Sequence, residues 1–155
     1  MMTAMSGLGL FGRLLGDPEV LEALSAQAAM GRMLAFERAW TQALLAMGVV
    51  DPVSAKQAVA RIDGFAPDLQ ALKVASETDG LPVPELVRQL RAGLPEAAQK
   101  AIHTGATSQD VLDTSTVLAA RDILSVLDQR GQRVLARLDE VQARFGTADM
   151  MGRTR

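Results

Sequence analysis

One apolar stripe constrains this chain more than any other feature of its sequence. Between residues 117 and 145, apolar residues recur at alternating steps of three and four positions, which places them on one face of a helix. This heptad pattern, sustained over about 29 residues, is typical of helices that pack against other long helices. The stripe consists of Val117, Ala120, Leu124, Leu127, Gly131, Val134, Leu138, Val141 and Phe145.

The expected length of this helix sets a second constraint. A helix from Ser108 to Phe145 would be about 57 Å long at about 1.5 Å per residue. A compact chain of 155 residues has a radius of gyration of about 15 Å, so it cannot bury such a helix alone. We therefore expect partner helices from sequence beyond this chain, from other subunits, or from both. Charged residues on the other faces, such as Arg121 and Arg130, are expected to be solvated or to form intersubunit ion pairs.

The composition favours a helical domain with a hydrophobic core. The chain holds 25 Ala and 21 Leu, both strong helix formers, and 48% of its residues are hydrophobic. Its net charge of -2 argues against nucleic-acid binding, and the absence of Cys together with a single His argues against a metal site. We find no export signal and no run of 18 apolar residues, so we expect a cytoplasmic protein that does not bind membranes.

Start and stop signals predict further helices upstream. Asp17-Pro18-Glu19 predicts a helix start, and the helical stretch that follows runs to about residue 47, interrupted near Gly31. Shorter helices are expected over 51–64, 67–76, 85–91 and 95–102. Within the first stretch, Glu37 lies between inward-facing positions, and the sequence assigns it no role. The inward-facing apolar positions there are Met33, Phe36, Trp40, Leu44 and Met47, which predict core rather than a cofactor site.

The segment from His103 to Thr114, His-Thr-Gly-Ala-Thr-Ser-Gln-Asp-Val-Leu-Asp-Thr, is the most informative for function. It places an imidazole, hydroxyls and an amide just before a helix start, where free backbone N–H groups bind anions. The spacing Thr107-x-x-Asp110 fits a capping box, and Gly105 allows the backbone to approach a ligand closely. The alternative is a plain capped helix start with a surface histidine.

A second candidate lies at residues 150–155. Arg153 and Arg155 flank Thr154, and two guanidinium groups can hold carboxylates through paired N–H bonds. The alternative is a basic, solvated tail.

The segment His103–Thr114 resembles the first signature region of the fumarase/aspartase superfamily, in the branch that holds adenylosuccinate lyase and 3-carboxy-cis,cis-muconate cycloisomerase. Gly16–Glu19, Met33–Glu37 and Leu81–Val87 resemble earlier parts of the same family, so the resemblance covers nearly the whole chain. It implies a truncated all-α fold. Residues 1–107 would form an N-terminal helical domain, and residues 108–155 would form the first long helix of a multi-subunit bundle and an incomplete second signature region.

The second signature region separates two branches of this superfamily. In the lyases it reads Arg-Thr-His-Gly with a catalytic His, whereas this chain reads Gly152-Arg153-Thr154-Arg155 and has Arg at the His position. In this respect the chain is similar to carboxymuconate cycloisomerases, which lack His there. The third region, Gly-Ser-Ser-x-Met-Pro-x-Lys with the catalytic Ser, does not occur in the sequence. We therefore expect these 155 residues alone to be inactive.

The resemblance implies an enzyme that converts 3-carboxy-cis,cis-muconate to carboxymuconolactone in protocatechuate breakdown, the β-ketoadipate pathway. It implies a small polycarboxylate substrate, no metal or organic cofactor, and a homotetramer in which three subunits build each active site. The alternatives are a fumarate-releasing lyase of the same superfamily, similar to adenylosuccinate or argininosuccinate lyase, and a non-catalytic helical assembly module.

Residue roles follow from the same resemblance. It places Thr107 and Ser108 on a substrate carboxylate, with His103 and Gln109 lining the pocket. Arg155 would be the catalytic residue, holding a carboxylate or stabilising a developing enolate-like charge as preorganised cations do. Arg153 and Thr154 would bind substrate beside it.

Overall fold

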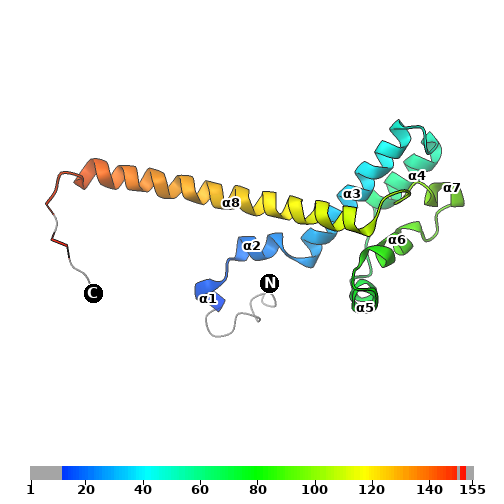
Figure 1. Cartoon of the computed structure of the whole chain (residues 1–155), viewed down its shortest axis with the longest axis horizontal. Coiled ribbons are helices and arrows are strands. Elements are labelled where there is room, and N and C mark those ends of the chain that lie inside the picture. The colour runs from blue at the N-terminus through cyan, green and yellow to red at the C-terminus, as the bar shows by residue number, and fades with distance from the viewer. Residues whose placement is uncertain (1–11, 150, 153–155) are drawn as a thin grey trace.

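The computed structural model describes residues 12–149 and 151–152, and every regular element in this part of the chain is an α-helix. Figure 1 shows α3 to α7 gathered at one end of α8, which projects from them as a single long rod. The all-α fold expected from the sequence is confirmed. In chain order the helices are α1 (Gly12–Leu15), α2 (Pro18–Ala23), α3 (Ala26–Ala46), α4 (Pro52–Asp63), α5 (Leu69–Asp79), α6 (Val83–Arg91), α7 (Glu96–Gln99) and α8 (Ser108–Phe145).

Side-chain caps explain where most of these helices begin. An Asp, Ser or Thr just before the helix accepts hydrogen bonds from backbone N–H groups of the first turn, which have no partner inside the helix. Because these short polar side chains precede apolar runs, the sequence marks the starts more clearly than the ends. The capping residues are Asp17 of α2, Ser25 of α3, Asp51 of α4, Asp68 of α5 and Thr107 of α8.

The break in the first helical stretch lies at Leu24–Ser25, so the expected interruption near Gly31 is wrong. The Ser25 hydroxyl accepts a hydrogen bond from the Ala28 N–H at 3.1 Å, which starts a new helix there. Gly31 lies inside α3 on an exposed position where a Cβ would meet nothing within 4 Å. The expected inward position of Met47 is also wrong. This side chain is 80% exposed, because α3 ends at Ala46 and Gly48 turns the chain with a φ of +69°.

We call residues 26–119 the head, because they contain the hydrophobic core. Buried side chains of α3, α4, α5 and α6 meet the first turns of α8 around Leu86, Leu90 and Ile102, all of which are fully buried. Val111 of α8 belongs to the same cluster. The core therefore fixes the start of the long helix against α3 and α6.

We call residues 131–145 the shaft, because this part of α8 has no cover from the described residues. Every shaft residue is exposed. Apolar side chains of the predicted stripe are 45–66% exposed along α8, from Val117 to Phe145. They are Val117, Leu124, Leu127, Val134, Leu138, Val141 and Phe145. Most of the stripe that the sequence predicts is thus left open to solvent.

An ion-pair cluster joins the middle of α8 to α2. Arg130 donates to both carboxylate oxygens of Asp17, with Nη2 lying 3.0 Å from Oδ1, and to Glu19 Oε2 at 2.5 Å. The Arg130 guanidinium is the main reason that the pKa of Asp17 is lowered to about 2. The charged faces of this helix were expected to be solvated or to meet other subunits, so the Arg130 pairing within the chain corrects that expectation at one position.

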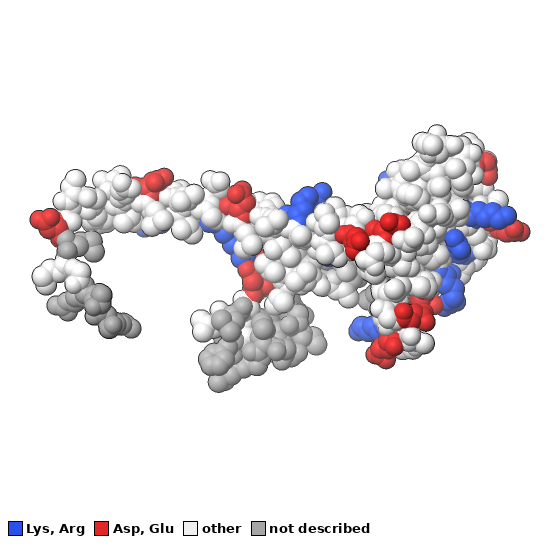
Figure 2. Space-filling view, viewed as in Figure 1, with Lys and Arg blue, Asp and Glu red and all other residues white. Residues whose placement is uncertain are grey.

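The surface charge is mixed. Figure 2 shows Lys and Arg side chains interspersed with Asp and Glu over the head and the long helix, with wide uncharged areas between them. Among the described residues, no helix is both long and apolar enough to cross a membrane.

Candidate functional site

The candidate site is the polar loop between α7 and α8 together with the first turn of α8. The structure brings His103, Thr107, Ser108 and Gln109 together there, as their closeness in sequence requires. Gly105 has a φ of +79°, a backbone conformation that favours glycine, so the loop turns sharply into the helix. The other predicted group, Arg153, Thr154 and Arg155, lies outside the described residues.

The predicted capping box is confirmed. The Asp110 N–H donates to Thr107 Oγ1 at 3.3 Å, and the Thr107 N–H donates to Asp110 Oδ2 at 2.8 Å. The Thr107 hydroxyl also donates to Asp110 Oδ2 at 2.8 Å, so it is committed to the cap. The first N–H groups of a helix have no acceptor within the helix, which makes those of Ser108 and Gln109 the natural donors to an anion.

Two carboxylates border this helix start. Hydrogen bonds from the backbone N–H and the hydroxyl of Thr107 lower the pKa of Asp110, and the nearby His103 ring adds to the effect. Asp113 accepts a hydrogen bond from Gln109 Nε2 at 2.5 Å, which holds the Gln109 side chain along the helix surface. The side chains of Thr107 and Gln109 are therefore already paired. The backbone N–H groups of Ser108 and Gln109 are directed towards the N-terminal end of the helix.

His103 is not a surface histidine. Its Nδ1 lies 2.6 Å from Oε1 of Glu37 on α3, and its side chain is only 14% exposed. The Glu37 side chain is completely buried, and its second oxygen, Oε2, has no hydrogen-bond partner among the described residues. His103 also has a φ of +58°, which is uncommon for a residue with a side chain and persists only where the surroundings hold it.

Side chains from the head hold the backbone on both sides of His103. Thr41 Oγ1 donates to the carbonyl of Ala101 at 2.8 Å, and Trp40 Nε1 donates to that of Thr104 at 2.9 Å. Arg91 Nη2 of α6 donates to the carbonyl of Ile102 at 2.7 Å. Trp40 and Thr41 lie three and four positions after Glu37, so one face of α3 contacts the loop at several points.

Glu37 is the residue that sequence reasoning missed. The sequence shows a carboxylate among inward-facing positions of a helix, and a buried carboxylate needs a partner. That signal was present, but the partner lies 66 positions later in the chain. Only the fold shows that this partner is the single histidine.

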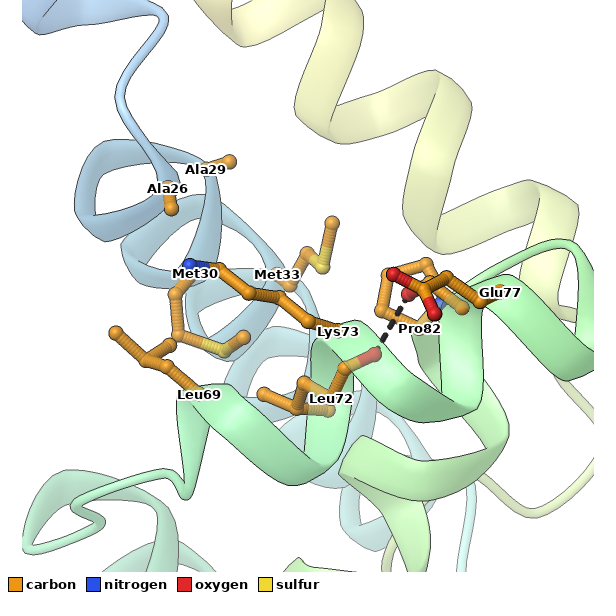
Figure 3. A pocket seen from close by; sticks show the side chains of 10 residues that line it. Ala26, Ala29, Met30, Met33, Leu69, Leu72, Lys73, Glu77 and Pro82 are labelled. Carbon is orange, nitrogen blue, oxygen red and sulfur yellow. Dashed lines mark hydrogen bonds between the residues drawn. The ribbon is translucent and has the colours of Figure 1, made fainter. Parts of the chain in front are cut away.

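A separate cavity of about 320 Å³ lies between α3 and α5. Figure 3 shows Met30, Met33 and Leu72 lining it, with Lys73 and Glu77 on α5 beside them. The Ser76 hydroxyl donates to the carbonyl of Leu72 at 2.7 Å, so it is already paired. The cavity is mostly apolar, and none of the predicted site residues line it.

The described residues also bear on metal binding. Within residues 12–149 and 151–152, no three His, Cys, Asp or Glu side chains are grouped in a way that could hold a metal ion.

Comparison with known proteins finds sequence relatives that include a cycloisomerase and a lyase. The chain is 32% identical to the 3-carboxy-cis,cis-muconate cycloisomerase of Pseudomonas putida over 151 residues, which cover 94% of this chain and 35% of that protein. It is 30% identical to the adenylosuccinate lyase of Methanothermobacter thermautotrophicus over 120 residues, or 77% of this chain and 27% of that protein. No family model matches the chain.

Two solved structures share the fold. The fumarate lyase from Mesorhizobium sp. BNC1 matches with a TM-score of 0.83 and 34% identity, over 90% of this chain and 33% of that one. The β-carboxy-cis,cis-muconate cycloisomerase from Acinetobacter calcoaceticus matches with a TM-score of 0.81 and 32% identity, over 94% and 35%. The chain thus spans about a third of the length of these proteins.

The fold, the polar loop before the long helix and these likenesses agree with one another. The chain belongs to the fumarase/aspartase superfamily, as its signature residues indicated. The relatives and structures described above are named as lyases and cycloisomerases, so the chain is part of a lyase-type enzyme family.

Proposed function

We propose that this chain is the N-terminal part of a cycloisomerase that converts 3-carboxy-cis,cis-muconate to carboxymuconolactone in protocatechuate breakdown. The proposal rests on the resemblance of Gly152-Arg153-Thr154-Arg155 to the second signature region, in which Arg155 would stand at the position of the catalytic His of the lyases. The likeness to a named cycloisomerase along 94% of the chain supports it. The proposed enzyme works in the cytoplasm without a metal or organic cofactor.

The proposed substrate suits the donors at the start of α8. It is a tricarboxylate, and the positive end of a helix dipole with free N–H groups favours carboxylates. We assign one substrate carboxylate to Ser108 and to the backbone N–H groups there, with His103 and Gln109 beside it. Because Asp110 and Asp113 add negative charge nearby, binding requires further cations. We assign this role to Arg155, with Arg153 and Thr154 as neighbours.

Arg155 also has a chemical role in the proposal. The lactone ring forms when one substrate carboxylate oxygen adds to a carbon–carbon double bond of the same molecule, whose electron pair becomes enolate-like negative charge next to another carboxylate. A proton from a general acid or water then adds to the carbon that carries this charge, which gives the lactone. A fixed guanidinium beside that charge stabilises the transition state more than the ground state. Replacing Arg155 by Ala should therefore lower kcat/KM by about 10² to 10³.

The proposed enzyme is an assembly of several subunits. We propose that the α8 helices of other subunits cover the exposed stripe of the shaft and form a homotetramer. Residues 1–107 are then the N-terminal domain, and residues 108–155 are the first part of the bundle. Leu138→Glu on the stripe should then abolish assembly in light scattering, because it buries a charge in the interface. Gln132→Glu adds the same charge on an exposed position outside the stripe and should leave assembly intact. Equal assembly of both variants would argue against this arrangement.

The test of activity uses the protein at its natural length. It should consume the ultraviolet absorbance of 3-carboxy-cis,cis-muconate, and Ser108→Ala should slow this turnover. Ser125→Ala is the matched control, since Ser125 is an exposed serine on the same helix, away from the loop. Loss of activity in Ser108→Ala alone excludes a purely structural assembly module.

The likeness to an adenylosuccinate lyase favours one other activity. A fumarate-releasing lyase would leave carboxymuconate unchanged and would act on adenylosuccinate or argininosuccinate, with fumarate as product. Turnover of either succinate compound without consumption of carboxymuconate would move the assignment to this branch.

The 155-residue chain alone should have no activity in either assay, because the region with the catalytic Ser does not occur in its sequence. Measurable turnover by this chain would contradict the expectation that it is inactive.

A further inference from the structure

We propose that Glu37 is a positioning residue that fixes the tautomer and orientation of His103. Its carboxylate accepts the Nδ1–H of the ring, so that Nε2 is left as a hydrogen-bond acceptor at the polar loop. The inference rests on the proposed function only in giving the His103 ring a substrate to face.

The first step is the geometry of the pair. Nδ1 and Glu37 Oε1 lie 2.6 Å apart, a short contact typical of a charge-assisted hydrogen bond. Glu37 is completely buried on α3, so water does not compete for this oxygen. Among the described residues, the other ring nitrogen, Nε2, has no hydrogen-bond partner, and the ring keeps 14% of its surface exposed. The ring is thus tied at one end and open at the other.

The second step concerns which group holds the shared proton. Two arrangements fit the distance: a carboxylate accepting from Nδ1–H, or a neutral carboxyl group donating to Nδ1. A carboxyl group is a stronger acid than an imidazolium, which places the proton on the ring. In the first arrangement the neutral ring carries its single proton on Nδ1. The second arrangement holds one proton more, because a neutral carboxyl group faces a neutral ring whose proton is on Nε2.

The third step is that the backbone does not fix the ring by itself. Trp40 and Thr41 hold the carbonyls of Thr104 and Ala101, which maintains the left-handed conformation of His103. Neither side chain has a hydrogen bond to the imidazole in the described structure. The loop conformation and the ring orientation therefore depend on different residues, which allows them to be separated by mutation.

The experiment uses ¹⁵N NMR of the imidazole in the 155-residue chain. His103 is the only histidine, so its two ring nitrogens give the only imidazole signals. At alkaline pH, where a histidine ring is neutral, we expect a pyrrole-type shift at Nδ1 and a pyridine-type shift at Nε2. The reverse pattern in the wild-type chain would overturn the proposal, because the proton would then lie on Nε2. This measurement needs no variant, so it holds even where a variant does not fold.

Two variants separate ring positioning from loop structure. Glu37→Leu removes the acceptor and should shift the ring towards the Nε2–H tautomer, which is the favoured form of a free histidine ring. Trp40→Phe removes a hydrogen bond to the loop but not the acceptor, so it should keep the wild-type tautomer. An unchanged tautomer in a folded Glu37→Leu chain, or the same shift in Trp40→Phe, would contradict a specific role for Glu37.

The outcome is independent of the proposed reaction. The tautomer is measured without substrate, so a protein that fails to turn over carboxymuconate would overturn the proposed function and leave the Glu37–His103 pair in place. Conversely, an active enzyme with the reversed tautomer would retain the function and exclude this role of Glu37.

Discussion

The head and the shaft have similar apolar patterns, yet they differ in how much of that pattern the chain itself covers. In the head, Leu86 and Leu90 of α6 are fully buried by neighbouring helices. In the shaft, Leu138 is 57% exposed although it belongs to a regular heptad stripe. Amphipathicity therefore indicates which side of a helix will be buried, whereas only chain length and topology decide what buries it.

Among the substitutions that test this comparison, Leu86→Ala in the head should have the largest effect on the free energy of unfolding. Removing a fully buried leucine side chain leaves a cavity in the core, so the free energy of unfolding should fall by about 2–5 kcal/mol. Urea denaturation followed by circular dichroism measures this change. A loss below about 1 kcal/mol would show that the head is loosely packed and resembles the shaft.

Thr107→Ala tests the junction where the long helix leaves the head. Loss of the capping side chain should lower the free energy of unfolding by about 1 kcal/mol. Thr116→Ala on the same helix is the control, since the Thr116 hydroxyl only donates to the Leu112 carbonyl one turn earlier. That control should be neutral or slightly stabilising, because alanine is the better helix former. Equal losses in the two variants would contradict a specific role for the cap.

Asp17→Asn tests the contact between α2 and the middle of α8. The pKa of Asp17 is lowered to about 2 by Arg130, so the ion pair stabilises the fold above the ordinary aspartate pKa and is lost as the pH falls from about 4 towards 2. Asn caps a helix about as well as Asp, so this variant removes the charge and retains the cap. The stability of the Asn variant should depend less on pH in that range. The stability lost with the ion pair should be smaller than the contribution of the Thr107 cap, because the pair is partly solvated. Identical acid denaturation of both chains would exclude this contribution.

Leu138→Ala in the shaft should have the smallest effect. Because nothing in the described chain packs on this side chain, the free energy of unfolding of the dilute 155-residue chain should change by less than about 0.5 kcal/mol. The same substitution should matter only where other helices cover the stripe. A loss in dilute solution comparable to that of Leu86→Ala would mean that the shaft is already buried there.

Local signals in the sequence predicted the parts of the fold that depend on neighbouring residues. The two residues of the capping box, Thr107 and Asp110, are three positions apart, and the stripe of α8 repeats within two turns, so both were predicted correctly. The break near Gly31 was placed wrongly because glycine weakens a helix without ending it, whereas the capping hydroxyl of Ser25 starts a new one. Local rules distinguish these two cases poorly.

Contacts between distant residues could not be predicted in the same way. Glu37 lies 66 positions from His103, and Asp17 lies 113 positions from Arg130, so neither pair leaves a periodic signal. For the candidate site, the sequence identified the loop and its residue types through their resemblance to a known signature. The buried support beneath the loop depends on how α3 crosses the start of α8, which is a property of the folded chain.

The continuity of α8 makes the number of residues between the head and the shaft a structural quantity in its own right. Each residue of an α-helix turns the chain by about 100° and advances it by about 1.5 Å. A single-residue deletion between Ala119 and Gly131 would therefore rotate the stripe of the shaft by about 100° about the helix axis relative to His103. No side chain of the loop or of the shaft would be changed. Seven added residues would move the stripe by about 10 Å but return it to nearly the same face. The number of residues between the loop and the stripe thus sets the angle between them about the helix axis. This angle should be preserved by most substitutions but changed by insertions or deletions.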